Sequence, residues 1–167
     1  GRKSPKLRRG WGGYRVKSSL NRTVEDAVTW CENPPDLLPV LIEGLLRQGA
    51  KMVLGGASKS RKSWILIQLA LAIVNGMRFL EMQCTKVRVL LINMELMEAE
   101  MANRIKAVSN AMGCGREGLF VWNLRGHSKD LELLANSIIA QAREIQAELI
   151  ILDPVYKVLG NRAENSN

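Results

Sequence analysis

The apolar positions of this chain fall into short continuous runs that alternate with longer stretches at helical spacing. The short runs predict strands, which we place at residues 52–54, 87–94, 119–123 and 149–152. The longer stretches predict helices, which we place at residues 64–74, 97–112 and 130–147. Strands that alternate with helices in this way are typical of an α/β domain with a mostly parallel sheet.

The two later helices are predicted to be amphipathic, so their apolar faces name the side chains expected in the core. The face of the first comprises Met97, Met101, Ile105, Val108 and Met112. The face of the second comprises Leu131, Leu134, Ile138, Ala142 and Ile145. Methionines at helical spacing indicate core packing, because a flexible thioether fills irregular gaps well.

The chain ahead of the first predicted strand carries a weaker helix signal. Thr23 is a good capping residue, and the acids Glu25 and Asp26 suit a first turn, which predicts a short helix at residues 23–31. A Pro-Pro pair ends that helix. Residues 36–46 then form an apolar stretch that is expected to lead into the first core strand.

The strand at 52–54, the polar loop after it and the helix at 64–74 form the arrangement of a P-loop. The chain from Gly56 to Ser63 reads G-A-S-K-S-R-K-S, which matches the phosphate-binding pattern except at Arg61, where glycine is usual. The N–H groups of such a loop surround an anionic phosphate, and the positive end of the next helix points at it. The alternative is an ordinary strand–turn–helix connection. The eleven residues of the helix are too few to span a bilayer, so no membrane partner is expected.

Within this loop, Lys62 is expected to contact the β- and γ-phosphates of ATP, and the Ser63 hydroxyl is expected to bind Mg²⁺. Arg61 has two interpretations. If its φ is positive, arginine there costs about 1 kcal/mol and weakens nucleotide binding; if its backbone is already helical, it is harmless. The predicted nucleotide-binding residues are Gly55, Gly56, Ala57, Ser58, Lys59, Ser60, Arg61, Lys62 and Ser63.

The strand at 149–152 ends in an acid, Asp153, as a Walker B strand does. Asp153 is predicted to hold Mg²⁺, directly or through water. The alternative is that it only caps the turn before Pro154. Ligands of parallel sheets bind at the carboxyl ends of the strands, and Lys62, Glu95 and Asp153 are all expected at that edge.

Pro154 occupies the position where many P-loop ATPases carry a water-activating glutamate. We therefore predict that Glu95, at the end of the second strand, orients the attacking water and is catalytic together with Lys62. The alternative for Glu95 is a solvated acid that starts the next helix, where acids are favoured.

The net charge of +8 is concentrated at the start of the chain. Residues 1–22 contain eight basic residues and no acid, whereas the other 16 basic and 16 acidic residues cancel. We expect a basic, disordered arm at 1–22, which is either solvated or in contact with nucleic acid, followed by one domain at 23–167. The three cysteines and the single histidine have no ligand-like spacing, which argues against a zinc site or disulfides and is typical of the cytoplasm.

A P-loop, a strand ending in glutamate and a Walker B strand without its own glutamate resemble the RecA-like ATPases. The segments PDLLPVLIEGLLRQGAKMVLGGASKSRKSW, LLINMELM and LIILDPVYKVLGNRAENSN resemble the AAA-family ATPases grouped with plasmid and phage RepA-type hexameric replicative helicases. The resemblance implies a RecA-like fold, ATP and Mg²⁺, assembly into a homo-oligomeric ring such as a hexamer, and a role on DNA. It also implies that the core continues with further strands beyond residue 167, so the sheet is expected to be incomplete.

Three functions fit these features. The first is an ATPase motor that acts as a replicative helicase or loads a protein onto DNA. The second is a nucleotide-dependent regulatory switch with little turnover. The third is a P-loop kinase for a small molecule, although no lid segment with arginines is apparent.

Overall fold

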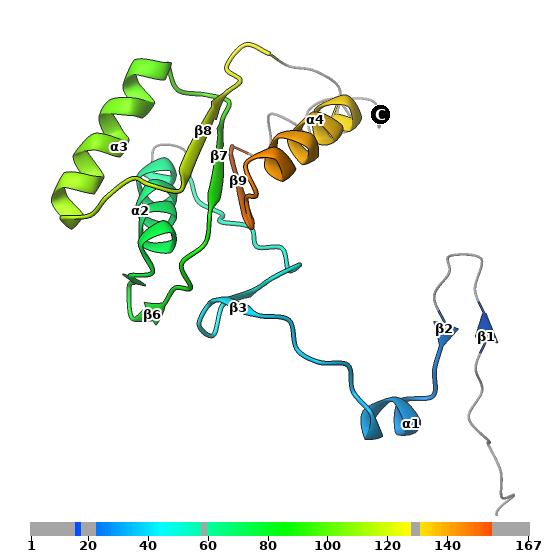
Figure 1. Ribbon diagram of the computed structural model, residues 1–167. Coiled ribbons are helices and arrows are strands. Elements are labelled where there is room, and N and C mark those ends of the chain that lie inside the picture. The colour runs from blue at the N-terminus through cyan, green and yellow to red at the C-terminus, as the bar shows by residue number, and fades with distance from the viewer. Residues whose placement is uncertain (1–15, 18–22, 58–59, 128–130, 155–167) are drawn as a thin grey trace, which may run out of the picture. The chain divides into compact units, whose positions relative to one another are not determined.

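The computed structural model describes residues 16–17, 23–57, 60–127 and 131–154 (Figure 1). The chain divides into two units, residues 1–37 and 38–167. Most of the predicted basic arm at 1–22, and loop residues Ser58 and Lys59, lie outside the described residues.

The second unit contains a parallel three-stranded sheet in the order β8 (Leu119–Asn123), β7 (Val89–Asn93), β9 (Leu149–Asp153). Helices α2 (Lys62–Asn75) and α3 (Glu98–Met112) lie on one side of the sheet, and α4 (Leu131–Glu144) lies on the other (Figure 1). This arrangement confirms the predicted α/β P-loop fold class. It also confirms the strands predicted at 87–94, 119–123 and 149–152.

The central strand β7 is buried at all five positions, because both of its faces are covered. Val89 and Leu91 belong to the apolar cluster formed with α2 and α3. Leu90 and Ile92 belong to a second cluster with Leu134, Ile138 and Ala142 of α4. Burial on both faces explains why the sequence of β7 is continuously apolar instead of alternating.

Helix α2 runs antiparallel to the strands on which it packs. Its last turn lies at their amino ends: a Cβ built on Gly118, the residue before β8, would be 3.7 Å from Cβ of Val74. The side chain of Asn75 donates to the carbonyl oxygen of Gly115 at 3.0 Å. The first residues of α2 therefore lie toward the carboxyl edge of the sheet, as a P-loop requires.

The ends of α2 and α3 follow the glycines in the sequence. Gly76 ends α2 in the left-handed conformation (φ 65°), and its N–H donates to the carbonyl oxygens of Ala72 and Ile73. Gly113 ends α3 in the same way (φ 61°). Both helix ends were predicted. The predicted apolar face of α3 is correct at Met101 and Ile105 but wrong at Met97, which is 61% exposed because it precedes the helix as its N-cap.

The predicted strand at 52–54 does not form. Met52, Val53 and Leu54 are 40%, 81% and 42% exposed, and no strand pairs with the outer edge of β9 among the described residues. The prediction failed because an apolar triplet shows only a preference for burial. A strand also needs a hydrogen-bonded neighbour, which the structure does not provide for this segment.

The helix predicted at 23–31 begins later. Thr23 does not cap it but belongs, with Val24, to β2 (Thr23–Val24), which pairs with β1 (Val16–Lys17). Helix α1 covers Ala27–Glu32, and its N-cap is Asp26, whose carboxylate accepts the N–H of Thr29 at 3.4 Å.

Residues 36–46 fold back on themselves instead of continuing into a core strand. Strands β3 (Val40–Ile42) and β4 (Leu46–Arg47) form a hairpin, and β5 (Arg78–Phe79) and β6 (Met82–Gln83) form another. An antiparallel bridge between Ile42 and Cys84 joins the two hairpins, which add to the core beneath α2. No helix in the described part of the chain is long and apolar enough to cross a membrane.

Candidate functional site

The loop before α2 is folded around the side chain of its own lysine. The ammonium group of Lys62 donates to the carbonyl oxygens of Gly56 at 2.8 Å and Ala57 at 2.7 Å, and to the hydroxyl of Ser60 at 3.4 Å. The positive charge is therefore held within the predicted phosphate-binding loop. Charge-assisted bonds of this kind are stronger than neutral ones, so a phosphate must compete with the loop carbonyls for Lys62.

The two glycines at the start of the loop differ in the space around them. A Cβ on Gly56 would lie 2.9 Å from Oγ of Ser60 and 3.5 Å from Cδ of Lys62, whereas a Cβ on Gly55 would meet nothing within 4 Å. A side chain at Gly56 would therefore require the Ser60 hydroxyl to move, whereas one at Gly55 would not disturb the loop. A loop that closes on a missing side chain fits the close approach of backbone to a phosphate.

Arg61 adopts the left-handed conformation, with φ 62° and ψ 27°. Of the two alternatives that the sequence left open, the structure therefore selects the strained one, at a cost of about 1 kcal/mol. Arg61 is the N-cap of α2, and its side chain makes no capping hydrogen bond. The first turn also contains no acid, so its N–H groups are not neutralised by a carboxylate of the first turn and favour an anion.

Asp153 is the last residue of β9 and is 6% exposed. Its carboxylate makes no hydrogen bond or ion pair within the described part of the chain. Every fully buried side-chain oxygen or nitrogen in these residues has a hydrogen-bond partner. Because the carboxylate oxygens of Asp153 have none, they must still contact solvent. A nearly buried carboxylate that is free to accept a ligand fits Mg²⁺, which binds through one or two carboxylates and keeps several waters.

A polar row that was not predicted from the sequence crosses the sheet at this edge. The parallel register places Asn93 of β7 beside Asn123 of β8 on one side and beside Asp153 of β9 on the other. Asn93 is fully buried. The signal was present in the sequence, because two otherwise apolar strands, VLLIN and LFVWN, both end in asparagine.

Glu95 follows β7 by two residues and is exposed. Its N–H donates to Oδ1 of Asn93 at 3.3 Å. Helix α3 begins at Glu98, and the acids of its first turn are Glu98 and Glu100. Glu95 therefore lies outside the helix, in an exposed turn at the carboxyl edge of the sheet.

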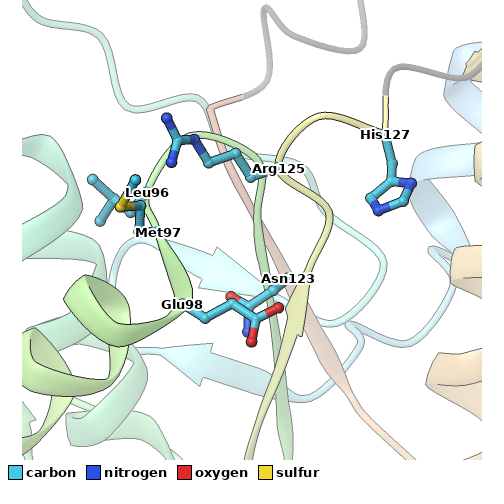
Figure 2. A pocket seen from close by; sticks show the side chains of 6 residues that line it. All are labelled: Leu96, Met97, Glu98, Asn123, Arg125 and His127. Atoms are coloured by element: carbon cyan, nitrogen blue, oxygen red, sulfur yellow. The ribbon is translucent and has the colours of Figure 1, made fainter.

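A cleft of about 250 Å³ opens beside this turn, between the start of α3 and the chain after β8. Figure 2 shows the side chains that line it, with Glu98 from the start of α3 and Asn123 from the end of β8 among them. They are Leu96, Met97, Glu98, Asn123, Arg125 and His127. Arg125 and His127 belong to no sequence motif, so neither was expected at this site.

Helices α2 and α3 are linked near the site. The guanidinium carbon of Arg104 lies 5.1 Å from the ring centre of Trp64, the residue after Ser63. Arg104 also pairs with Glu100 one turn earlier. The start of the phosphate-loop helix is thereby attached to the helix that follows Glu95.

The cysteines do not contribute to this site. Burial raises the pKa of the Cys84 thiol and that of the Cys114 thiol, the latter opposed by the charge of Arg116. Both thiols therefore stay protonated near neutral pH. Within residues 23–57, 60–127 and 131–154, no three His, Cys, Asp or Glu side chains cluster as a metal site.

The fold and this edge define a class: an α/β protein with a phosphate-binding loop and a buried acid at the carboxyl ends of its parallel strands. The family described as "AAA domain" matches residues 18–167. The chain belongs to this family of P-loop ATPases, which supports nucleotide binding. Comparisons with curated proteins and with solved structures found no match.

Proposed function

We propose that this protein binds ATP together with Mg²⁺ at the carboxyl edge of its sheet and hydrolyses it. The observation that carries the proposal is the arrangement of three elements at one edge. The start of α2 brings Lys62, the turn after β7 brings Glu95, and the end of β9 brings Asp153. ATPase chemistry needs these three kinds of group: a cation for phosphate, an acid for water and an acid for the metal.

Each side chain has a distinct role in this proposal. The loop N–H groups and Lys62 bind the phosphates, with Lys62 exchanging its bonds to Gly56 and Ala57 for phosphate oxygens. Ser63 and Asp153 would hold Mg²⁺, which neutralises charge on the phosphates. Glu95 orients the attacking water, because Pro154 leaves no acid directly after Asp153.

We propose further that the ATPase is a motor of the RecA-like type, assembled as a homo-oligomeric ring in the cytoplasm and acting on DNA as a replicative helicase or loader. The resemblance of the loop and Walker B segments to RepA-type helicases supports this proposal. The eight basic residues at 1–22 also support it, because a concentrated positive charge binds nucleic acid phosphates.

A second function, a nucleotide-dependent switch with little turnover, is favoured by two observations in the loop. Arg61 is strained where glycine is usual, and Lys62 is held by the loop carbonyls. Both would lower nucleotide affinity. Turnover that increases when single-stranded DNA is added supports the motor, whereas ATP binding without DNA-stimulated turnover supports the switch.

Titration calorimetry of Lys62→Ala tests the shared premise. We expect Mg-ATP affinity to fall at least about tenfold, which corresponds to about 1.4 kcal/mol. Lys106→Ala, which removes an exposed lysine from α3, is the matched control and should bind as the wild type does. Equal affinity of wild type and Lys62→Ala would reject the phosphate-loop assignment.

A further inference from the structure

We propose that Asn93 is the positioning residue for Glu95, and that its pairing with Asn123 holds the turn in the geometry that ATP hydrolysis requires. This inference rests on the proposed function, since it assigns the group that fixes the water-orienting acid. It adds two residues, Asn93 and Asn123, from the ends of two neighbouring strands.

The side chain of Asn93 forms four hydrogen bonds. Its Oδ1 accepts the N–H of Leu96 at 2.9 Å and that of Glu95 at 3.3 Å. Its Nδ2 donates to the carbonyl oxygen of Leu96 at 2.9 Å and to Oδ1 of Asn123 at 2.9 Å. An asparagine amide has two donors and two acceptor positions, so every one of them is used.

These hydrogen bonds constrain the backbone of the turn that carries Glu95. Asn93 binds the N–H of Glu95 and both the N–H and the carbonyl group of Leu96. The backbone that carries the Glu95 side chain is therefore fixed to the end of β7 by one buried side chain. Asparagine side chains form such turns by imitating a backbone group.

Asn123 stabilises one orientation of the Asn93 side-chain amide. The side-chain amide of Asn93 could in principle rotate by half a turn and exchange its oxygen and nitrogen. The N–H groups of Leu96 and Glu95 require Oδ1 on their side, and the carbonyl oxygen of Asn123 accepts one N–H of Asn93 and stabilises the same orientation. Asn123 thus acts on Glu95 through Asn93.

The turn after β7 is also connected to Asp153, the proposed Mg²⁺-binding residue. Asn93 stands in register with Asp153, and the N–H of Met94 donates to the carbonyl oxygen of Asp153 at 2.9 Å. The strand ends bearing Asn93 and Asp153 are therefore joined by backbone hydrogen bonds. Glu95 lies in the turn from Asn93 to Leu96, and this turn is attached directly to the joined strand ends.

ATP hydrolysis and ATP binding should respond differently to Asn93→Ala. We expect ATP affinity to stay within about twofold of wild type, because the loop and Lys62 are untouched, while turnover falls about 10- to 100-fold, since small misplacements of a reacting group are costly. Asn93→Ser should recover part of the loss, because a hydroxyl forms the same turn more weakly. The loss of turnover in Asn123→Ala should lie between the losses in Asn93→Ser and Asn93→Ala.

A matched control separates positioning from general loss of structure. Asn75 also donates to two carbonyl oxygens, those of Leu71 and Gly115, but at the opposite end of the sheet. Asn75→Ala should lower stability while leaving turnover close to wild type at temperatures where it is folded. Equal losses of turnover in Asn75→Ala and Asn93→Ala would overturn the positioning role.

Two further measurements decide the inference. Hydrogen exchange of the Glu95 and Leu96 amides should accelerate at least about tenfold in Asn93→Ala, and unchanged exchange would overturn it. In the double variant Asn93→Ala/Glu95→Gln, turnover should be no lower than in Glu95→Gln alone, because both act on one step. Additive losses would show that Asn93 does not act through Glu95.

The same variants distinguish failure of this inference from failure of the proposed function. If Glu95→Gln is inactive but Asn93→Ala hydrolyses ATP at the wild-type rate, only the positioning role is rejected. If Glu95→Gln retains the wild-type rate, or if the wild-type protein does not hydrolyse ATP, the proposed role of Glu95 fails and the positioning role falls with it.

Discussion

Asn93 and Asp153 are direct neighbours across the parallel strands β7 and β9, although sixty residues separate them in the sequence. One is buried within a network of side-chain bonds, and the other offers a nearly buried carboxylate. Their adjacency places the turn that carries Glu95 beside the proposed metal-binding acid.

Glu95→Gln should abolish most hydrolysis while preserving binding. Glutamine keeps the shape of the side chain but removes the negative charge that polarises water, so turnover should fall by about 10². ATP affinity should not change, because the phosphate contacts come from the loop before α2. Glu117→Gln, which neutralises an exposed acid near the amino end of β8, at the opposite edge of the sheet, is the control and should retain turnover. A wild-type rate for Glu95→Gln would show that water is oriented by another group.

Asp153→Asn should alter the response to Mg²⁺. The amide lacks the charge that attracts a hard cation, so raising the Mg²⁺ concentration should strengthen ATP binding less than it does in wild type. Calorimetric titrations with ATP at several Mg²⁺ concentrations measure this dependence. The same Mg²⁺ dependence in both proteins would mean that Asp153 serves only the turn before Pro154.

Arg61→Gly and Arg61→Ala together test the strained backbone. Both remove the charge, but only glycine removes the Cβ that disfavours a φ of 62°. The glycine variant should be more stable than the alanine variant by about 1 kcal/mol, which corresponds to roughly 2–4 °C in melting temperature for a domain of this size. Thermal denaturation of the two variants measures the difference. Equal melting temperatures would contradict a left-handed Arg61.

Gly55→Ala and Gly56→Ala should separate the two glycines of the loop. A methyl group on Gly56 meets Ser60 and Lys62, whereas one on Gly55 meets open space. Mg-ATP affinity should therefore fall more in Gly56→Ala than in Gly55→Ala, which should bind as the wild type does. Calorimetry under the conditions used for Lys62→Ala provides the comparison. The reverse order would contradict the loop geometry described above.

The sequence by itself determined the elements that depend on local pattern. Continuous apolar runs predicted β7, β8 and β9, helical spacing predicted α2, α3 and α4, and glycines predicted the ends of α2 and α3. These predictions succeed because burial preference and backbone freedom are properties of neighbouring residues. The same local logic identified Lys62, Glu95 and Asp153 as candidate site residues, since each follows an apolar run or a phosphate-loop pattern.

Only the tertiary structure decided the features that depend on distant partners. Met52–Leu54 has the composition of a strand, but no described strand pairs with it and it remains exposed. Arg61 had two possible backbone states, and the junction between loop and helix selected the left-handed one. The row of Asn123, Asn93 and Asp153 exists because of strand register. Register and pairing are set by hydrogen bonds between residues far apart in the chain, which a local pattern does not encode.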